Sequence, residues 1–217
     1  MIPRPTPTPS RITTPSRMTL PRLATSLLLA GALLLASAAP HAQAQSAADI
    51  ASSLGQEIQT GEVPENGSSV SWGSAVGVVD QPMDQVMGVV QDYANYSHFM
   101  PHFRTSRVIA QRGSDAMIYL EVGIIRNTAT LWGQLRLREL PARGASRVVE
   151  ARLVQGNMDQ FRARWELTPV DATHTLVRFR ILVAPNLPLP ASVFTSENVK
   201  AARRTLSALR ERMLALG

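Results

Sequence analysis

Hydrophobic and polar residues alternate along most of the chain from residue 70 onward, which is the pattern of half-buried β-strands. The first alternating run covers residues 70–78, where Val70, Trp72 and Val76 share one face. Six further runs occupy residues 105–111, 115–125, 129–140, 146–154, 161–169 and 174–184. Turn-forming residues such as Gly113-Ser114 and Asp171-Ala172 separate them, and such short connections require antiparallel pairing. The pattern therefore predicts a sheet of seven antiparallel strands.

Helical spacing appears at two places between and after these strands. After Pro82, apolar residues recur at helical intervals and predict a short helix over 82–93, followed by a second short turn over 94–99 that stops at Pro101. Near the end of the chain, one apolar stripe repeats every three or four residues, at positions 199, 202, 206, 209, 213 and 216. It predicts a helix over 192–216, which at 1.5 Å per residue is about 36 Å long and can cross a sheet.

The segment before the first strand has a weaker pattern. Residues 47–58 are compatible with a short helix, and Gly61, Pro64, Asn66 and Gly67 then favour turns and loops. We therefore expect a lead-in segment over 45–67 and a folded domain over 68–217.

The amino end has the three parts of a secretory signal. Arg17 and Arg22 precede an apolar run over 23–39, and Ala42-Gln43-Ala44 supplies a small-x-small cleavage site. We expect cleavage after Ala44 and export to the periplasm or cell envelope; the alternative is a retained membrane anchor, for which the run is slightly short. Residues 1–17 are rich in Pro, Thr and Ser and fit an over-long start upstream of an initiator at Met18.

Charge and cysteine content narrow the classes of function. The net charge of the whole chain is +6, but residues 45–217 contain 18 basic and 16 acidic residues, a net charge of +2. No long basic cluster interrupts this part, so nucleic-acid binding is not expected. The chain has no cysteine, which excludes disulfides, thiolate nucleophiles and sulfur-ligated metals.

The order of elements resembles the helix-grip fold of the START-like (SRPBCC) superfamily, and in particular its polyketide cyclase/dehydrase and coenzyme Q-binding branch. Three groups of residues carry the resemblance. The first follows the first strand: Pro82, Val86, Asp92, Tyr93, Tyr96, Phe99, Pro101 and Ser106-Arg107-Val108. The second lies in the strand pair over 156–177, with Gly156, Phe161, Trp165, Leu167, Pro169 and Thr175-Leu176-Val177, and the third follows the final strand, with Pro185, Pro188 and Pro190. The resemblance covers about residues 68–216. It implies an α+β fold in which a seven-stranded sheet wraps a long C-terminal helix, with two short helices after the first strand.

In this superfamily the gap between sheet and helix is a ligand cavity, so the resemblance also implies a binding site. We expect Tyr93, Tyr96, Phe99 and Met100 at its entrance, in a segment that opens easily, and Tyr119, Trp132 and Trp165 among the ligand-binding residues. For Trp165, as for Trp72 and Phe161, an ordinary core position is the favoured interpretation over contact with a ligand. Glu121, Arg136 and Arg138 share the face of Tyr119 and Trp132, and a solvated outer face with cross-strand ion pairs is the favoured interpretation for them.

Few residues point to catalysis. His98, His102 and Asp92 form the one compact titratable group near the expected entrance. Pro101 separates the two histidines from a shared helix, so a metal site is not expected, and Asp92 could instead hold a turn. Phosphate-binding loops and dinucleotide glycine patterns are absent, and no cofactor is expected.

The main hypothesis is an exported, non-catalytic binder or carrier of a hydrophobic small molecule: a lipid, a quinone or a polyketide-like compound. A cyclase/dehydratase-type enzyme using the same cavity and a small interaction domain without a ligand are the alternatives. Family members known for coenzyme Q or ribosome association act inside cells, so the export signal argues against a ribosomal partner. Transient membrane contact fits a carrier, and the sequence sets no expectation for oligomeric state.

Overall fold

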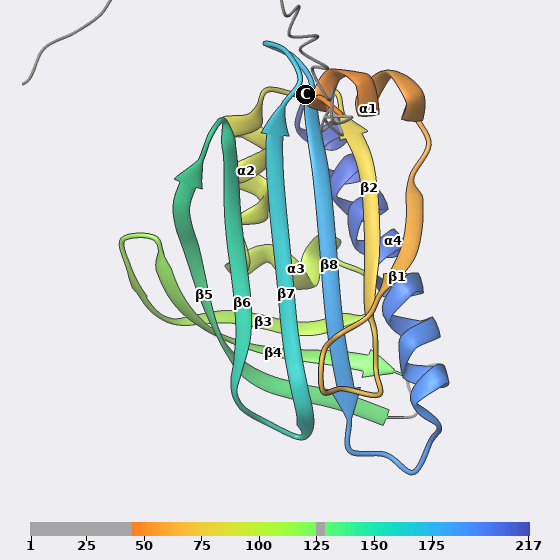
Figure 1. The fold of residues 1–217 in the computed structure, drawn as a ribbon. Coiled ribbons are helices and arrows are strands. Elements are labelled where there is room, and N and C mark those ends of the chain that lie inside the picture. Colours follow the sequence, from red (N-terminus) through yellow and green to blue (C-terminus); the bar gives the residue numbers. More distant parts are fainter. Residues whose placement is uncertain (1–44, 125–128) are drawn as a thin grey trace, which may run out of the picture. The chain divides into compact units, whose positions relative to one another are not determined.

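The computed structural model describes residues 45–124 and 129–217, so the predicted signal lies outside the described residues (Figure 1). All elements below belong to one compact unit, residues 43–217. Because this unit contains its own sheet and its own core, we expect residues 45–217 to fold independently. In the part of the chain that the structure describes, no helix is long and apolar enough to cross a membrane.

Eight antiparallel strands form one sheet in the order β1-β2-β8-β7-β6-β5-β4-β3. The elements in chain order are α1 (Ala47–Leu54), β1 (Gln59–Val63), β2 (Trp72–Val79), α2 (Met83–Val90), the 3₁₀ turn η1 (Tyr93–Asn95), α3 (Tyr96–Phe99), β3 (Phe103–Arg112), β4 (Asp115–Ile124), β5 (Ala129–Arg143), β6 (Ser146–Gly156), β7 (Met158–Pro169), β8 (Thr175–Pro185) and α4 (Ala191–Leu216). The predicted α+β helix-grip architecture is confirmed: α4 lies along β2 and β8 on one face, and the short helices lie on the same side (Figure 1).

The predicted number of seven strands is wrong by one, because the segment assigned as lead-in contains β1. Residues Gln59 to Val63 pair antiparallel with Trp72 to Val76 of β2. Gly61 and Glu62 have low strand propensity and the turn formers Pro64, Asn66 and Gly67 follow, so the local sequence favours a loop. Hydrogen bonding to the edge of β2 outweighs that preference.

The interior is a continuous apolar core between the sheet and α4. Ala202, Leu206, Leu209 and Met213, four positions of the predicted stripe, are buried, whereas Leu216 at its end is 56% exposed. Every second residue of the strands faces this core, and Trp165 is one of them. Full burial of a leucine-sized side chain contributes about 1.5–3 kcal/mol, so this stripe is a main source of the attraction between helix and sheet.

Close approach of α4 to β2 depends on Gly73. A Cβ atom at this position would collide with the backbone of Asn198 on α4, so only glycine fits. Asn198 is itself buried, and its side-chain amide donates to the carbonyl oxygens of Ser71 (3.1 Å) and Val183 (3.3 Å). These bonds fix the amino-terminal half of α4 between β2 and β8.

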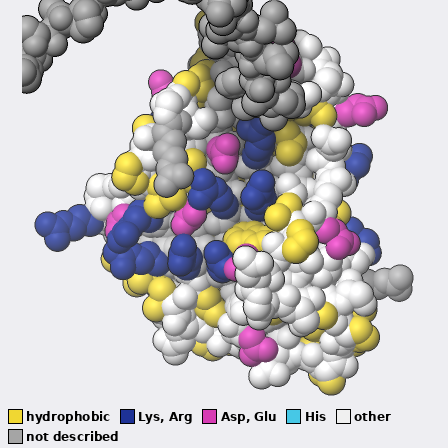
Figure 2. Space-filling model, viewed as in Figure 1, with side chains coloured by type: hydrophobic (Ala, Val, Ile, Leu, Met, Phe, Trp, Pro, Cys, Tyr) yellow, Lys and Arg dark blue, Asp and Glu magenta, His cyan; other side chains and the backbone are white. Residues whose placement is uncertain are grey.

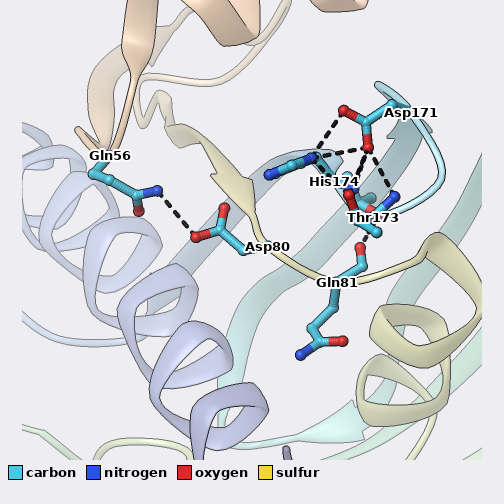
Figure 3. Close-up of polar contacts among 7 residues, drawn as sticks. Gln56, Asp80, Gln81, Asp171, Thr173 and His174 are labelled. Carbon is cyan, nitrogen blue, oxygen red and sulfur yellow. Dashed lines mark hydrogen bonds and ion pairs between the residues drawn. The ribbon is translucent and has the colours of Figure 1, made fainter.

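Polar contacts fasten the opposite end of the sheet (Figure 3). In the β7–β8 turn, Asp171 accepts the backbone N–H of Thr173 at 2.7 Å and contacts the His174 ring at 2.8 Å. These interactions lower the pKa of Asp171 to about 2, and the hydrogen bond from the Thr173 backbone makes the largest contribution. Nearby, Gln56 donates to the Asp80 carboxylate at 3.0 Å, which joins the segment after α1 to the end of β2.

Candidate ligand-binding site

A pocket of about 480 Å³ opens at one end of the sheet, where β4 ends, β5 begins, β6 turns into β7 and β8 leads to α4. This volume lies within the range of small-molecule sites, about 300–1,000 Å³. Its lining combines apolar and polar side chains: Ile124, Ala129, Thr130, Leu131, Gly156, Asn157, Met158, Asp159, Asn186 and Leu187. Asp159 is the one titratable residue among them.

The polar rim is held by Asn157 in the β6–β7 turn. Its side-chain oxygen accepts the backbone N–H of Trp132 at 2.8 Å, and its amide nitrogen donates to the Thr130 carbonyl at 2.9 Å. The Thr130 hydroxyl in turn accepts a bond from Arg104 at 2.8 Å. This network fixes the start of β5 against the turn, so one wall of the pocket is preorganised.

Met158 forms the inner wall of the pocket. It is 6% exposed, and a Cβ atom at Gly133 would lie 3.4 Å from its terminal methyl group and 3.1 Å from Leu153. Val122, which pairs with the lining residue Leu131, and Phe161, three residues after Met158 on β7, are partly buried and pack against the core. A flexible methionine side chain thus separates the open pocket from the apolar interior.

The residues predicted at the entrance lie inside the molecule. Tyr93, Tyr96 and Met100 are each 6% exposed or less, and Tyr96 donates from its hydroxyl to the Val90 carbonyl. Tyr96 also makes edge-to-face contacts with Tyr93 and with Phe99, at 5.8 and 5.6 Å between centroids. The expectation that this segment is weakly packed is therefore wrong, because the segment, although short, is part of the main core. Its opening stays a prediction.

Burial also changes the chemistry of the two tyrosines. Desolvation, with a smaller contribution from Glu139, raises the pKa of Tyr93 to about 12, and burial raises the pKa of Tyr96 well above its usual value. Both phenols are therefore neutral at physiological pH. Phe99 packs at the edge of the same cluster, with the Arg212 guanidinium 5.6 Å from its ring centroid.

Tyr119 and Trp132 lie on the outer face of the sheet, away from α4, which corrects their expected place in an interior cavity. Their rings stack at 6.3 Å, and Arg107 lies 5.0 Å from the Tyr119 centroid. The cause is the strand alternation: Ile118 and Leu120 take the inward positions of β4 and leave Tyr119 outside. Trp165 does face inward and packs on Phe179 at 4.2 Å.

Four charged residues on the strands of Tyr119 and Trp132 occupy the same outer face: Asp115, Glu121, Arg136 and Arg138. Asp115 pairs with Arg136 at 2.9 Å and with Arg138 at 3.2 Å, and Glu121 accepts from the Tyr119 hydroxyl at 2.6 Å. The solvated face favoured for Arg136, Arg138 and Glu121 is the observed arrangement. Trp72 lies on this face too, 4.8 Å below the Arg162 guanidinium.

The candidate acid–base group does not converge on the pocket. His98 and His102 are exposed, and Asp92 accepts a hydrogen bond from the Asn95 amide at 2.8 Å, as a turn-forming residue does. His102 also has a φ of 67°, which places it in a left-handed turn before β3. Among the described residues, no group of three or more His, Cys, Asp or Glu side chains could hold a metal ion.

The pocket residues themselves were missed by sequence reasoning. Ile124, Asn157 and Leu187 stand at strand ends and in connections, where periodicity gives no information. The turn at Gly156-Asn157 and the prolines that follow β8 were visible, but only the strand register brings these two connections together at one end of the sheet.

Comparisons with known proteins place the chain among proteins of this architecture. Residues 79–210 match the family described as "Polyketide cyclase / dehydrase and lipid transport". The match does not single out a coenzyme Q-binding branch. No curated protein sequence gives a significant match.

Several solved structures share the fold at low sequence identity. A STAR-related lipid transfer protein from Xanthomonas axonopodis has a TM-score of 0.64 and 18% identity, over 71% of this chain and 92% of that one. A START superfamily protein from Mycobacterium smegmatis has a TM-score of 0.59 and 18% identity, over 67% and 99%. The Zhui aromatase/cyclase from Streptomyces has a TM-score of 0.53 and 17% identity, over 74% and 99%. At these identities the likeness shows the fold.

Proposed function

Since the chain belongs to the polyketide cyclase/dehydrase and lipid transport family, we propose that it binds a hydrophobic small molecule through the pocket at the end of the sheet. The observation that carries the proposal is the position of Met158, which lies between an open, half-apolar pocket and the apolar interior. In this proposal, rotation of the Met158 side chain and displacement of its neighbours open the pocket toward the core, and an unbranched thioether rotates at small energetic cost.

The ligand's apolar part then contacts the inward-facing residues beyond Met158. Phe161 and Val122 are the first of these, because they are only partly buried and lie at the edge of the core. The ligand then contacts residues that lie deeper in the core: Trp165, Tyr93, Tyr96, Phe99 and Met100. They remain ligand-binding candidates, as part of the interior and not as an entrance. The ligand's polar end stays among Thr130, Asn157 and Asn186 at the rim.

Binding or carriage fits this site better than catalysis. An enzyme of the cyclase/dehydratase type requires titratable side chains that converge on the bound substrate. Here the pocket lining has Asp159 alone, and His98 and His102 are exposed elsewhere. A lipid, a quinone or a polyketide-like compound matches the apolar walls.

Export to the periplasm or cell envelope completes the proposal. It is supported by the basic flank, apolar run and Ala42-Gln43-Ala44 exit at the amino end. Amino-terminal sequencing of the exported protein checks it. A mature chain that begins at Gln45 agrees with the proposal, whereas an intact 23–39 segment retained in membranes contradicts it.

Uptake of a fluorescent fatty acid by residues 45–217 tests the route past Met158. Met158→Trp fills the passage and should weaken uptake about ten-fold, a change equivalent to ~1.4 kcal/mol. Met158→Ala widens the passage and should speed uptake. Met117→Ala, a change of the same kind on the outer face, is the matched control and should leave uptake unchanged.

The outcome that removes this route is equal uptake by the parent, Met158→Trp and Met158→Ala proteins, with all three folded by circular dichroism. Failure of the parent to bind fatty acid, quinone or polyketide-like probes contradicts the proposed function itself.

A further inference from the structure

The outer face of the sheet carries seven arginines on the four adjacent strands β5 to β8. They alternate with buried residues and therefore all point away from α4: Arg136, Arg138, Arg152, Arg162, Arg164, Arg178 and Arg180. We refer to this set as the arginine face. Figure 2 looks onto it and shows dark-blue side chains grouped across the middle of the sheet.

Strand register places several of these arginines directly beside one another. Arg136 pairs with Arg152, and Arg152 pairs with Arg162, which makes one cross-strand row of three cations. Arg164 and Arg180 are likewise opposite each other on β7 and β8. Like charges in directly opposed positions destabilise a sheet, so folding alone does not explain this arrangement.

The carboxylates that form ion pairs with these seven arginines neutralise only part of their charge. Asp115 is shared by Arg136 and Arg138, Glu150 by Arg152 and Arg164, and Glu166 by Arg164 and Arg178, while Glu65 pairs with Arg162: four acids in all. Among residues 45–124 and 129–217, Arg180 has no ion-pair partner.

The face is therefore more positive than the rest of the domain. Seven arginines less four carboxylates leave a charge of +3, while residues 45–217 as a whole carry 18 basic less 16 acidic residues, or +2. The remainder of that sequence is thus slightly negative, at −1. The charge is also accessible, since the side chains of Arg136 and Arg152 are 54% and 66% exposed.

We propose that the arginine face docks the protein on the surface of a bilayer that contains anionic phospholipids. Arginine donates bidentate hydrogen bonds to phosphate oxygens, and these cations are spread in two dimensions over four strands, as lipid phosphates are over a membrane. A nucleic-acid backbone would instead be followed by a line of cations along a groove. Trp72, beneath Arg162 at the margin of the face, is of the residue type that favours the membrane interface.

Cosedimentation of residues 45–217 with vesicles tests this docking. Phosphatidylglycerol vesicles should bind the protein and phosphatidylcholine vesicles should not, and ~0.5 M salt should release it because exposed charges are then screened. Each basic residue near an anionic surface adds about five-fold to binding, so the variant Arg136→Gln, Arg152→Gln, Arg162→Gln should bind about 100-fold more weakly.

Arg162 also pairs with Glu65, so its replacement can disturb the fold. A second variant therefore leaves Arg162 in place. Arg152→Gln with Arg180→Gln removes two exposed cations and should weaken binding by about 25-fold. The matched control is Lys200→Gln, Arg203→Gln, Arg204→Gln, which removes three exposed cations from α4 and should leave vesicle binding unchanged.

Three results would overturn the docking proposal. These are unchanged binding by both arginine-face variants, loss of binding in the α4 control instead, or tighter binding to duplex DNA or RNA than to phosphatidylglycerol vesicles in the same buffer. None of them bears on fatty-acid uptake through the Met158 pocket, so the two proposals fail separately.

Discussion

At the scale of single residues, Gly73 and Gly88 differ in whether the surrounding structure requires a glycine. Gly73 lies where β2 meets α4, and a Cβ atom there would overlap the Asn198 backbone. Gly88 lies in α2, and a Cβ atom there would meet nothing within 4 Å. The first glycine is required by packing, whereas the second only lowers the helix propensity of α2.

Alanine at these two positions should therefore have opposite effects on stability. Gly73→Ala must push α4 away from β2 and should cost about 1–3 kcal/mol or more of the free energy of unfolding, as overpacking does. Gly88→Ala should stabilise by about 0.4–1 kcal/mol. Urea denaturation of both variants measures this difference, and a Gly73→Ala protein as stable as the parent would show that α4 does not approach β2 this closely.

Residue-level prediction from sequence succeeded where alternation was clear and failed where the inner face had to be chosen. Alternation placed Tyr119 and Trp132 correctly on a shared face but did not identify it as the outer one. The distinction comes from the opposite residues: Ile118 and Leu120 are fully apolar and take the core positions. The short length of the segment around Tyr96 does not predict its burial, because burial depends on the layers around a segment and not on its own size.

At the scale of elements, long periodic segments were predictable and the short edge strand was not. The stripe on α4 and the runs that became β3 to β8 contain strong local signals, and their observed bounds lie within three residues of the expected ones. β1 has no such signal, since its pairing partner β2 supplies the stabilisation. The pocket likewise depends on how strand ends meet, which local sequence does not encode.

The packing of α4 gives a prediction at this scale. Leu206 and Leu209 are fully buried, while Leu214 on the same helix is 80% exposed. Leu206→Ala or Leu209→Ala should each destabilise the domain by about 2–5 kcal/mol, because a cavity is left between helix and sheet. Leu214→Ala should change stability by less than about 0.5 kcal/mol, as surface substitutions do. Thermal or urea unfolding of the three variants would contradict the packing if the losses were equal.

At the scale of the whole molecule, the sheet separates two surfaces with different chemistry. Its inner face and α4 enclose the apolar core that the Met158 pocket borders, and its outer face presents the arginine face. If both proposals hold, one face of the sheet contacts the membrane while the pocket at the sheet's end exchanges an apolar molecule. The fold supplies both surfaces from one strand alternation.

The central claim, that this domain holds a hydrophobic small molecule, is tested most directly by native mass spectrometry of residues 45–217 purified under gentle conditions. The account predicts a fraction of the protein at a mass above that of the polypeptide, with the excess mass released as an apolar compound on activation. It also predicts that Met158→Trp, which fills the passage, lowers that fraction. A spectrum with the bare polypeptide alone, both as purified and after incubation with fatty acids and quinones, would contradict the claim.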